Sequence, residues 1–266
     1  MMERLLMLRV QAQGCTVEAS VNDIPLGRAS AAAGPLCLPV HEYVVEGGNE
    51  VALSIEPGPP GVERGAAPRV ADGTMAAGLR LLLPRIGRVG TEDQARTVGE
   101  LSWSVPEGTV FDAPLRVQDR VALPITFPAW RWLQLPVIED VPAQRGPVAA
   151  FLHRIAADMM RGEFQSLLAA SRLRLGELAL ADRPPVAEVA QRLVSQLGGL
   201  HAAGRLRLLV PAEDQLLLRP CAHGRLLECL DAGGAAALRP AGTAQQPSFE
   251  WPVRLAVANG RCHVFR

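Results

Sequence analysis

Apolar and polar residues alternate with a period of two through the first half of the chain. This alternation is typical of β-strands that turn one face toward a hydrophobic core. Turn-forming residues separate the alternating stretches at residues 22–23, 47–49 and 106–108, and residues 56–74 form a longer segment rich in Pro and Gly. No helical periodicity precedes residue 145, so we expect an antiparallel β-sandwich or jelly roll. The expected strands lie around Val10, Ala19, Leu38, Leu53, Leu81, Trp103 and Leu123.

The hydrophobic period changes after residue 145. Apolar residues between 148 and 168 recur at every third or fourth position, which predicts amphipathic helix with a break at residues 161–163. A further helix is expected at residues 185–197, because this stretch begins on prolines and ends at two glycines. Alternating stretches then return between hairpin turns such as Asn259-Gly260. The strands expected there are residues 206–210, 216–218, 226–229, 236–238, 249–257 and 262–265.

A domain boundary is expected near residue 143. Residues 139–147 contain two prolines and a glycine and fit a linker. Residues 1–142 hold 12 Arg and 17 acidic residues, a net charge of −5, whereas residues 143–266 hold 15 Arg and 10 acidic residues, a net charge of +5. We therefore predict a β-sandwich domain at residues 1–142 and an α+β domain at residues 143–266. The opposite charges fit two domains of different origin, or electrostatic complementarity between domains or between copies.

Part of the first half resembles a known family. Residues 21–27 (VNDIPLG) and residues 40–53 (VHEYVVEGGNEVAL) resemble the turn-and-strand pattern of galactose-binding-like jelly rolls. In that fold a Gly/Asn turn leads into a strand that crosses the sandwich. The resemblance implies the fold more than a ligand, because many members bind no sugar.

The second half resembles the NTF2-like (SnoaL-like) α+β cone fold. Residues 157–168 (ADMMRGEFQSLL) are similar to the helix junction of that family, with Glu163 where Asp is commoner. Residues 251–265 resemble its final hairpin. The order of elements differs, because family members place a strand before the third helix and only Leu178–Leu180 is a candidate for it here. An unrelated α+β domain therefore remains an alternative.

Composition narrows the setting of the protein. The 266 residues are 48% hydrophobic and 20% charged with a net charge of zero, so the chain has no general attraction to nucleic acid or anionic membranes. All 27 basic residues are arginine, which indicates the codon bias of a GC-rich bacterial genome. The five cysteines lack metal-ligand spacing, and we expect reduced thiols, no metal and no cofactor. No apolar stretch suits a signal peptide or a membrane span, so we expect a cytoplasmic protein.

Few residues are candidates for chemistry. The sequence contains no GxGxxG after a strand, no phosphate-binding GxxxxGK motif, no HExxH and no GxSxG. The resemblance to the cone fold implies a pocket at the open end of the sheet, and strand alternation sends only half of the polar residues into it. The candidate ligand-binding residues there are Arg219, Glu228, Glu250, Arg254 and His263.

Trp130 and Trp132 form a second candidate cluster in a chain with only 4% aromatic residues. On a strand the two indoles would share one face. They fit an aromatic platform for a sugar, or an apolar seal between the sandwich and the second domain.

Three function hypotheses follow. The leading one is a non-enzymatic binding or interaction protein with a protein partner or a second copy of itself, because no catalytic constellation is visible. The second is an enzyme or ligand-binding protein that uses the cone pocket for a small apolar molecule. The third is carbohydrate binding by the N-terminal sandwich.

Overall fold

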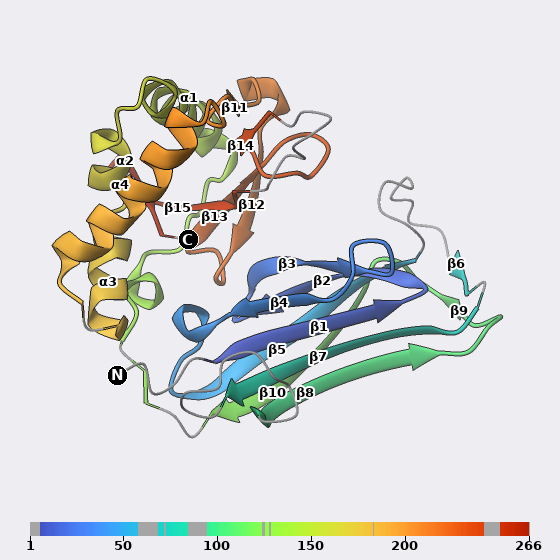
Figure 1. Ribbon diagram of the computed structural model, residues 1–266. Coiled ribbons are helices and arrows are strands. Elements are labelled where there is room, and N and C mark those ends of the chain that lie inside the picture. Colours follow the sequence, from blue (N-terminus) through green and yellow to red (C-terminus); the bar gives the residue numbers. More distant parts are fainter. Residues whose placement is uncertain are drawn as a thin grey trace. The chain divides into compact units, whose positions relative to one another are not determined.

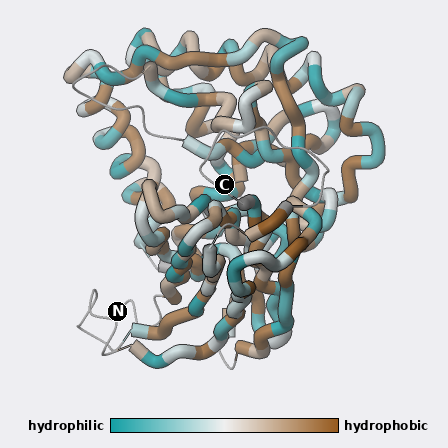
Figure 2. Tube along the Cα trace, turned by 90° about the vertical axis from the view of Figure 1, so that its right-hand side faces the viewer, coloured by the Kyte–Doolittle hydropathy of each residue, from teal (hydrophilic) through white to brown (hydrophobic). Residues whose placement is uncertain are grey.

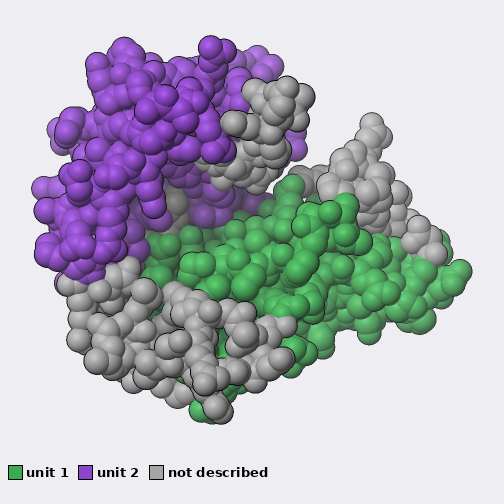
Figure 3. All heavy atoms as spheres, viewed as in Figure 1, with its two compact units in different colours: residues 1–127 green, residues 128–266 purple. Residues whose placement is uncertain are grey.

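The protein is described from a computed structural model that covers residues 6–57, 69–71, 73–84, 95–123, 126–127, 129–182, 184–241 and 251–265. The chain divides into two compact units, Met1–Phe127 and Pro128–Arg266 (Figure 3). This division lies 15 residues before the predicted boundary at 142/143. Residues 129–141 belong to the second unit, where the backbone N–H of Ile138 donates to the carbonyl of Gly224 at 2.9 Å.

The described residues of the first unit form two four-stranded antiparallel sheets and a two-stranded ribbon (Figure 1). One sheet has the order β4 (Leu36–Pro39), β1 (Met7–Gln13), β7 (Met75–Pro84) and β8 (Ala95–Val105). The other has the order β10 (Leu115–Leu123), β5 (Gly47–Pro57), β2 (Cys15–Val21) and β3 (Ile24–Ser30). A two-stranded ribbon joins β6 (Arg69–Val70) to β9 (Val110–Phe111), and a 3-10 helix, η1, spans His41–Tyr43. The antiparallel strands predicted by the alternation are confirmed, whereas residues 58–68 and 72 of the predicted loop lie outside the described residues.

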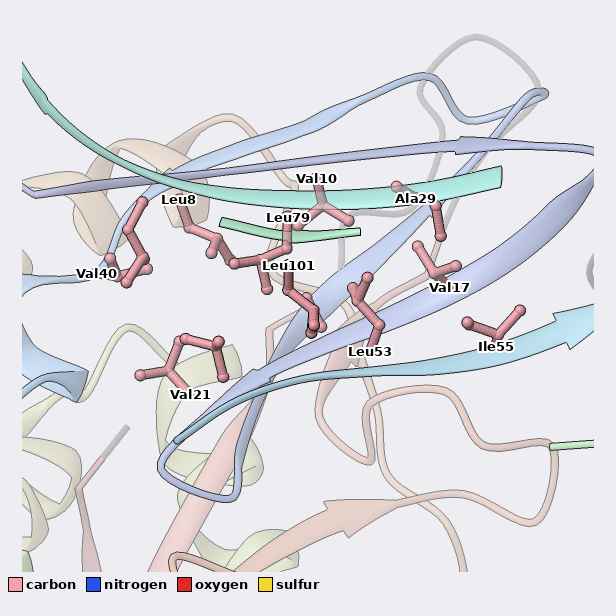
Figure 4. Packing of buried hydrophobic residues seen from close by; sticks show 14 of the residues in the cluster. Leu8, Val10, Val17, Val21, Ala29, Val40, Leu53, Ile55, Leu79 and Leu101 are labelled. Carbon is pink, nitrogen blue, oxygen red and sulfur yellow. The ribbon is translucent and has the colours of Figure 1, made fainter. Parts of the chain in front are cut away.

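The core of this unit lies between the two sheets. Leu8, Val10 and Leu79 of one sheet point toward Val17, Leu53 and Ile55 of the other, and all six side chains are fully buried (Figure 4). Hydrophobic and hydrophilic stretches alternate along the trace of the chain, as Figure 2 shows. The period of two therefore places one apolar face of each sheet in the core.

Two buried asparagines organise the turns of this unit. Asn22 and Asp23 both have positive φ, 51° and 60°, which closes the two-residue hairpin between β2 and β3. The amide of Asn22 donates to Oδ1 of Asn49 at 2.8 Å and to the carbonyl of Tyr43 at 2.9 Å. Asn49 in turn exchanges hydrogen bonds of 2.8 Å with the backbone of Val45 in both directions. These are the Asn positions of the segments that resemble jelly rolls, and they tie the segment between η1 and β5 to the β2–β3 hairpin.

The second unit combines four α-helices with antiparallel strands. The helices are α1 (Arg145–Met160), α2 (Gln165–Ala170), α3 (Arg172–Asp182) and α4 (Val186–Ala202). The main sheet has the order β12 (Leu217–Cys221), β13 (Leu226–Leu230), β15 (Val253–Ala258) and β16 (Arg261–Val264). A smaller pair joins β11 (Leu208–Leu209) to β14 (Arg239–Pro240). The 3-10 helices are η3 (Arg131–Gln134), η4 (Pro142–Gln144) and η5 (Glu213–Gln215).

The helices of this unit lie together on one side of its strands (Figure 1). Leu152, Ile155 and Met159 of α1 share a buried cluster with Cys229, Val253 and Leu255 of the sheet. The expected helices and the final hairpin with positive φ at Asn259 and Gly260 are present. The strand expected at residues 236–238 is wrong, because only Ala236 forms an isolated bridge there and β14 begins at Arg239. Leu178–Leu180 lies within α3 and is not the strand that the resemblance called for. Its Leu and Ala residues favour a helix, and a helix extends it on both sides.

One glycine is required where the two sheets of the first unit approach each other at their edge strands. A Cβ at Gly99 of β8 would lie 2.5 Å from Cγ1 and 2.8 Å from Cγ2 of Val121 on β10. The pairing of β7 with β8 also shifts register between Leu81 and Leu82, next to this contact. The bulge and the missing side chain together let β8 approach β10.

Gly99→Ala is expected to destabilise the chain by about 1–3 kcal/mol, because the new methyl group overlaps a branched side chain on a neighbouring strand. Gly78→Ala on β7 is the matched control, since nothing lies within 4 Å of its Cβ position. Urea unfolding measures both. Equal free energies of unfolding for the two variants would show that Gly99 is not a packing requirement.

Candidate functional site

Three of the predicted ligand-binding residues meet in one row across the main sheet of the second unit. Arg219 on β12 is the register partner of Glu228 on β13, and Glu228 is the register partner of Arg254 on β15. Nε of Arg219 donates to Oε2 of Glu228 at 2.8 Å, and Nη2 of Arg219 makes a second, shorter contact with the same oxygen. Nη2 of Arg254 donates to Oε1 of Glu228 at 3.0 Å. We call these three residues the charged row.

The charged row is largely removed from water. The side chains of Glu228 and Arg254 are 6% and 4% exposed, and that of Arg219 is 35% exposed. Alternation places the row on the sheet face opposite Cys229 and Val253, which pack against the helices. Each oxygen of the buried carboxylate accepts at least one guanidinium hydrogen bond, and this pairing offsets the cost of its desolvation.

His263 and Glu250 complete the set predicted for this sheet. His263 on β16 pairs with Ala256, two residues after Arg254, so its side chain lies on the same face as the charged row. The backbone N–H of Phe265 donates to the carbonyl of Arg254 at 2.9 Å, which continues the backbone pairing with β15 just beyond the end of β16. Glu250 lies outside the described residues. The sequence therefore identified residues that the sheet brings together, although it gave no sign that they bind one another.

Trp130 and Trp132 do not lie on a strand. They flank the start of η3, and each is only 1% exposed. A sugar platform requires accessible ring faces, so this pair does not provide the exposed surface on which the carbohydrate hypothesis was based. The local sequence is flanked by prolines at 128 and 136, which disfavour a continuous strand.

Glu177 is a buried polar residue that the sequence did not single out. It lies on α3, is 2% exposed, and its carboxylate accepts a short hydrogen bond from the backbone N–H of Arg131. This contact attaches the first turn of η3 to a helix 46 residues away in sequence. A carboxylate at the N-terminus of a helical turn is electrostatically favourable. The periodicity of α3 could have revealed it, because Glu177 interrupts an otherwise small and apolar stretch.

The helix junction that resembles the cone family is held by its own ion pairs. Nη2 of Arg161 lies 2.5 Å from Oδ1 of Asp158 and 3.0 Å from Oε2 of Glu163. The hydrogen bond to Glu163 is the main cause of the raised pKa of Arg161. The hydroxyl of Ser166 donates to the other oxygen of Asp158. Gly162, with φ of 79°, allows the chain to leave α1, so these charges stabilise a helix terminus.

Asp231 is a second structural carboxylate, at the end of β13. Its Oδ1 accepts from the backbone N–H groups of Gly233 and Ala235, each at 2.9 Å. Oδ2 lies 2.6 Å from Nη2 of Arg239. Burial by itself raises the pKa of Asp231, but the hydrogen bond from Ala235 and the interactions with Arg239 outweigh it, so the net pKa is lowered.

The described residues contain few groups suited to catalysis. Burial raises the pKa of the Cys15 and Cys262 thiols, and it raises that of Cys229 far above its usual range, so these thiols are uncharged and poor nucleophiles. Within the described ranges no three His, Cys, Asp or Glu side chains are grouped so that they could hold a metal ion. Glu228 is buried, but both of its oxygens are bonded to guanidinium groups. A carboxylate in this state is badly placed to take a proton from a substrate.

Among the described helices none is long and apolar enough to cross a membrane.

Glu228→Gln is expected to destabilise the protein by about 3 kcal/mol, because it removes the carboxylate charge that pairs with the buried guanidinium of Arg254. The ion pair with Arg219 contributes less to this loss of stability, because water screens its part-exposed guanidinium. The matched control is Glu188→Gln on α4, which breaks an exposed pair with Arg192 at 2.5 Å and is expected to cost less than about 0.5 kcal/mol. Urea unfolding compares the two. Equal losses would contradict a structural role for the charged row.

Asp231→Asn is expected to remove a pH-dependent part of the stability. The pKa of Asp231 lies below its ordinary value of 3.8 in the folded protein. Its contribution is therefore present above the unfolded value and is lost as the pH falls through the lower folded value. The difference in the free energy of unfolding between wild type and variant should be constant above about pH 5 and shrink below about pH 4. A difference that does not change down to about pH 2 would contradict the assignment.

Comparisons with known proteins do not identify the chain. No protein-family model, no curated protein and no solved structure matches it. A functional assignment therefore rests on the residues of the site and on their chemistry.

Proposed function

We propose that this chain is a non-enzymatic binding or interaction protein. It would consist of a jelly-roll-like sandwich and an NTF2-like α+β domain, and it would act in the bacterial cytoplasm with a protein partner or a second copy of itself. The helices precede an antiparallel sheet whose strands follow chain order, which supports the second fold, although α3 occupies the place of the strand that the family has before its third helix. The absence of any disulfide among the five cysteines is compatible with a reducing compartment.

The state of Glu228 is the observation that carries this proposal. A catalytic carboxylate in a pocket needs an oxygen directed at the substrate and an environment that matches its pKa to the reaction. Both oxygens of Glu228 instead accept hydrogen bonds from the guanidinium groups of Arg219 and Arg254. Three of the five predicted lining residues thus bind one another across three strands. This favours a scaffold over a reaction centre.

The test is to purify the affinity-tagged full chain from its source cells under gentle conditions and to measure the mass of the native complex. We expect a defined mass above that of a single chain, as a dimer or as a fixed ratio with one partner. Cells that express the tag alone are the control. Recovery of the bare monomer, without partner or ligand, would overturn the proposal.

A third outcome is a single chain that carries a bound small molecule. The purified protein is then incubated with that molecule and the mixture is analysed for products. An unchanged molecule would support binding without catalysis. Conversion to a product would contradict the non-enzymatic assignment and favour an enzyme that uses the cone.

A further inference from the structure

We draw no further inference here: the strongest candidate, the surface patch formed by the exposed valines Val70 and Val110, which face each other across the two-stranded β6–β9 ribbon of the first unit, is an apolar face for which nothing in the structure shows what covers it.

Discussion

A carboxylate that leaves water needs hydrogen-bond donors or cations to replace the hydration that it loses. Glu228 meets this requirement through its two neighbours in the sheet, Arg219 and Arg254. The pairing also constrains strand register. A slip of one residue would turn Glu228 toward the face that packs on the helices and separate it from both arginines. The charged row is therefore satisfied in the observed register of β12, β13 and β15.

In the first unit the buried polar side chains are neutral amides, and they too need hydrogen-bond partners. Asn22 and Asn49 are 7% and 0% exposed, and each side chain is satisfied by the other and by the backbone. A buried amide without partners would cost about 1–3 kcal/mol, so the two residues and the turns around them depend on each other. In both units a polar interaction between segments distant in sequence fixes the geometry, and apolar packing supplies the bulk of the stability.

Most of the longer strands and helices were predictable because their apolar residues repeat with a clear period. Val10, Leu53 and Leu255 are fully buried where alternation expected a core face. The expectation that Trp130 and Trp132 lie on a strand was wrong, because a separation of two residues does not by itself define a strand and here it falls at the start of a 3-10 helix. Leu178–Leu180 was ambiguous for the same reason, since three residues are too few to distinguish a strand from a helix.

The charged row was predicted as a set of residues but not as an interaction. Alternation assigns Arg219, Glu228 and Arg254 to faces, yet which residues stand opposite one another depends on the hairpin register. Glu177 and Arg131 show the same limit more strongly, because their contact joins segments whose distance in space no local pattern encodes. The division into compact units after Phe127 reflects contacts in space, whereas the boundary predicted at 142/143 was based on hydrophobic period, a linker and charge.

We propose that the charged row is a structural ion-pair network and that it holds no ligand. The most direct measurement replaces all three residues at once, Arg219→Met, Glu228→Leu and Arg254→Met, and records the Tm and the mass of the native complex. Apolar residues of similar volume often replace a buried ion-pair network without loss of stability. We therefore expect a cooperative unfolding transition with a Tm equal to or above that of the wild type, and the same complex. A triple variant that folds normally but loses its complex would contradict the account, because it would place the charged row in the binding site.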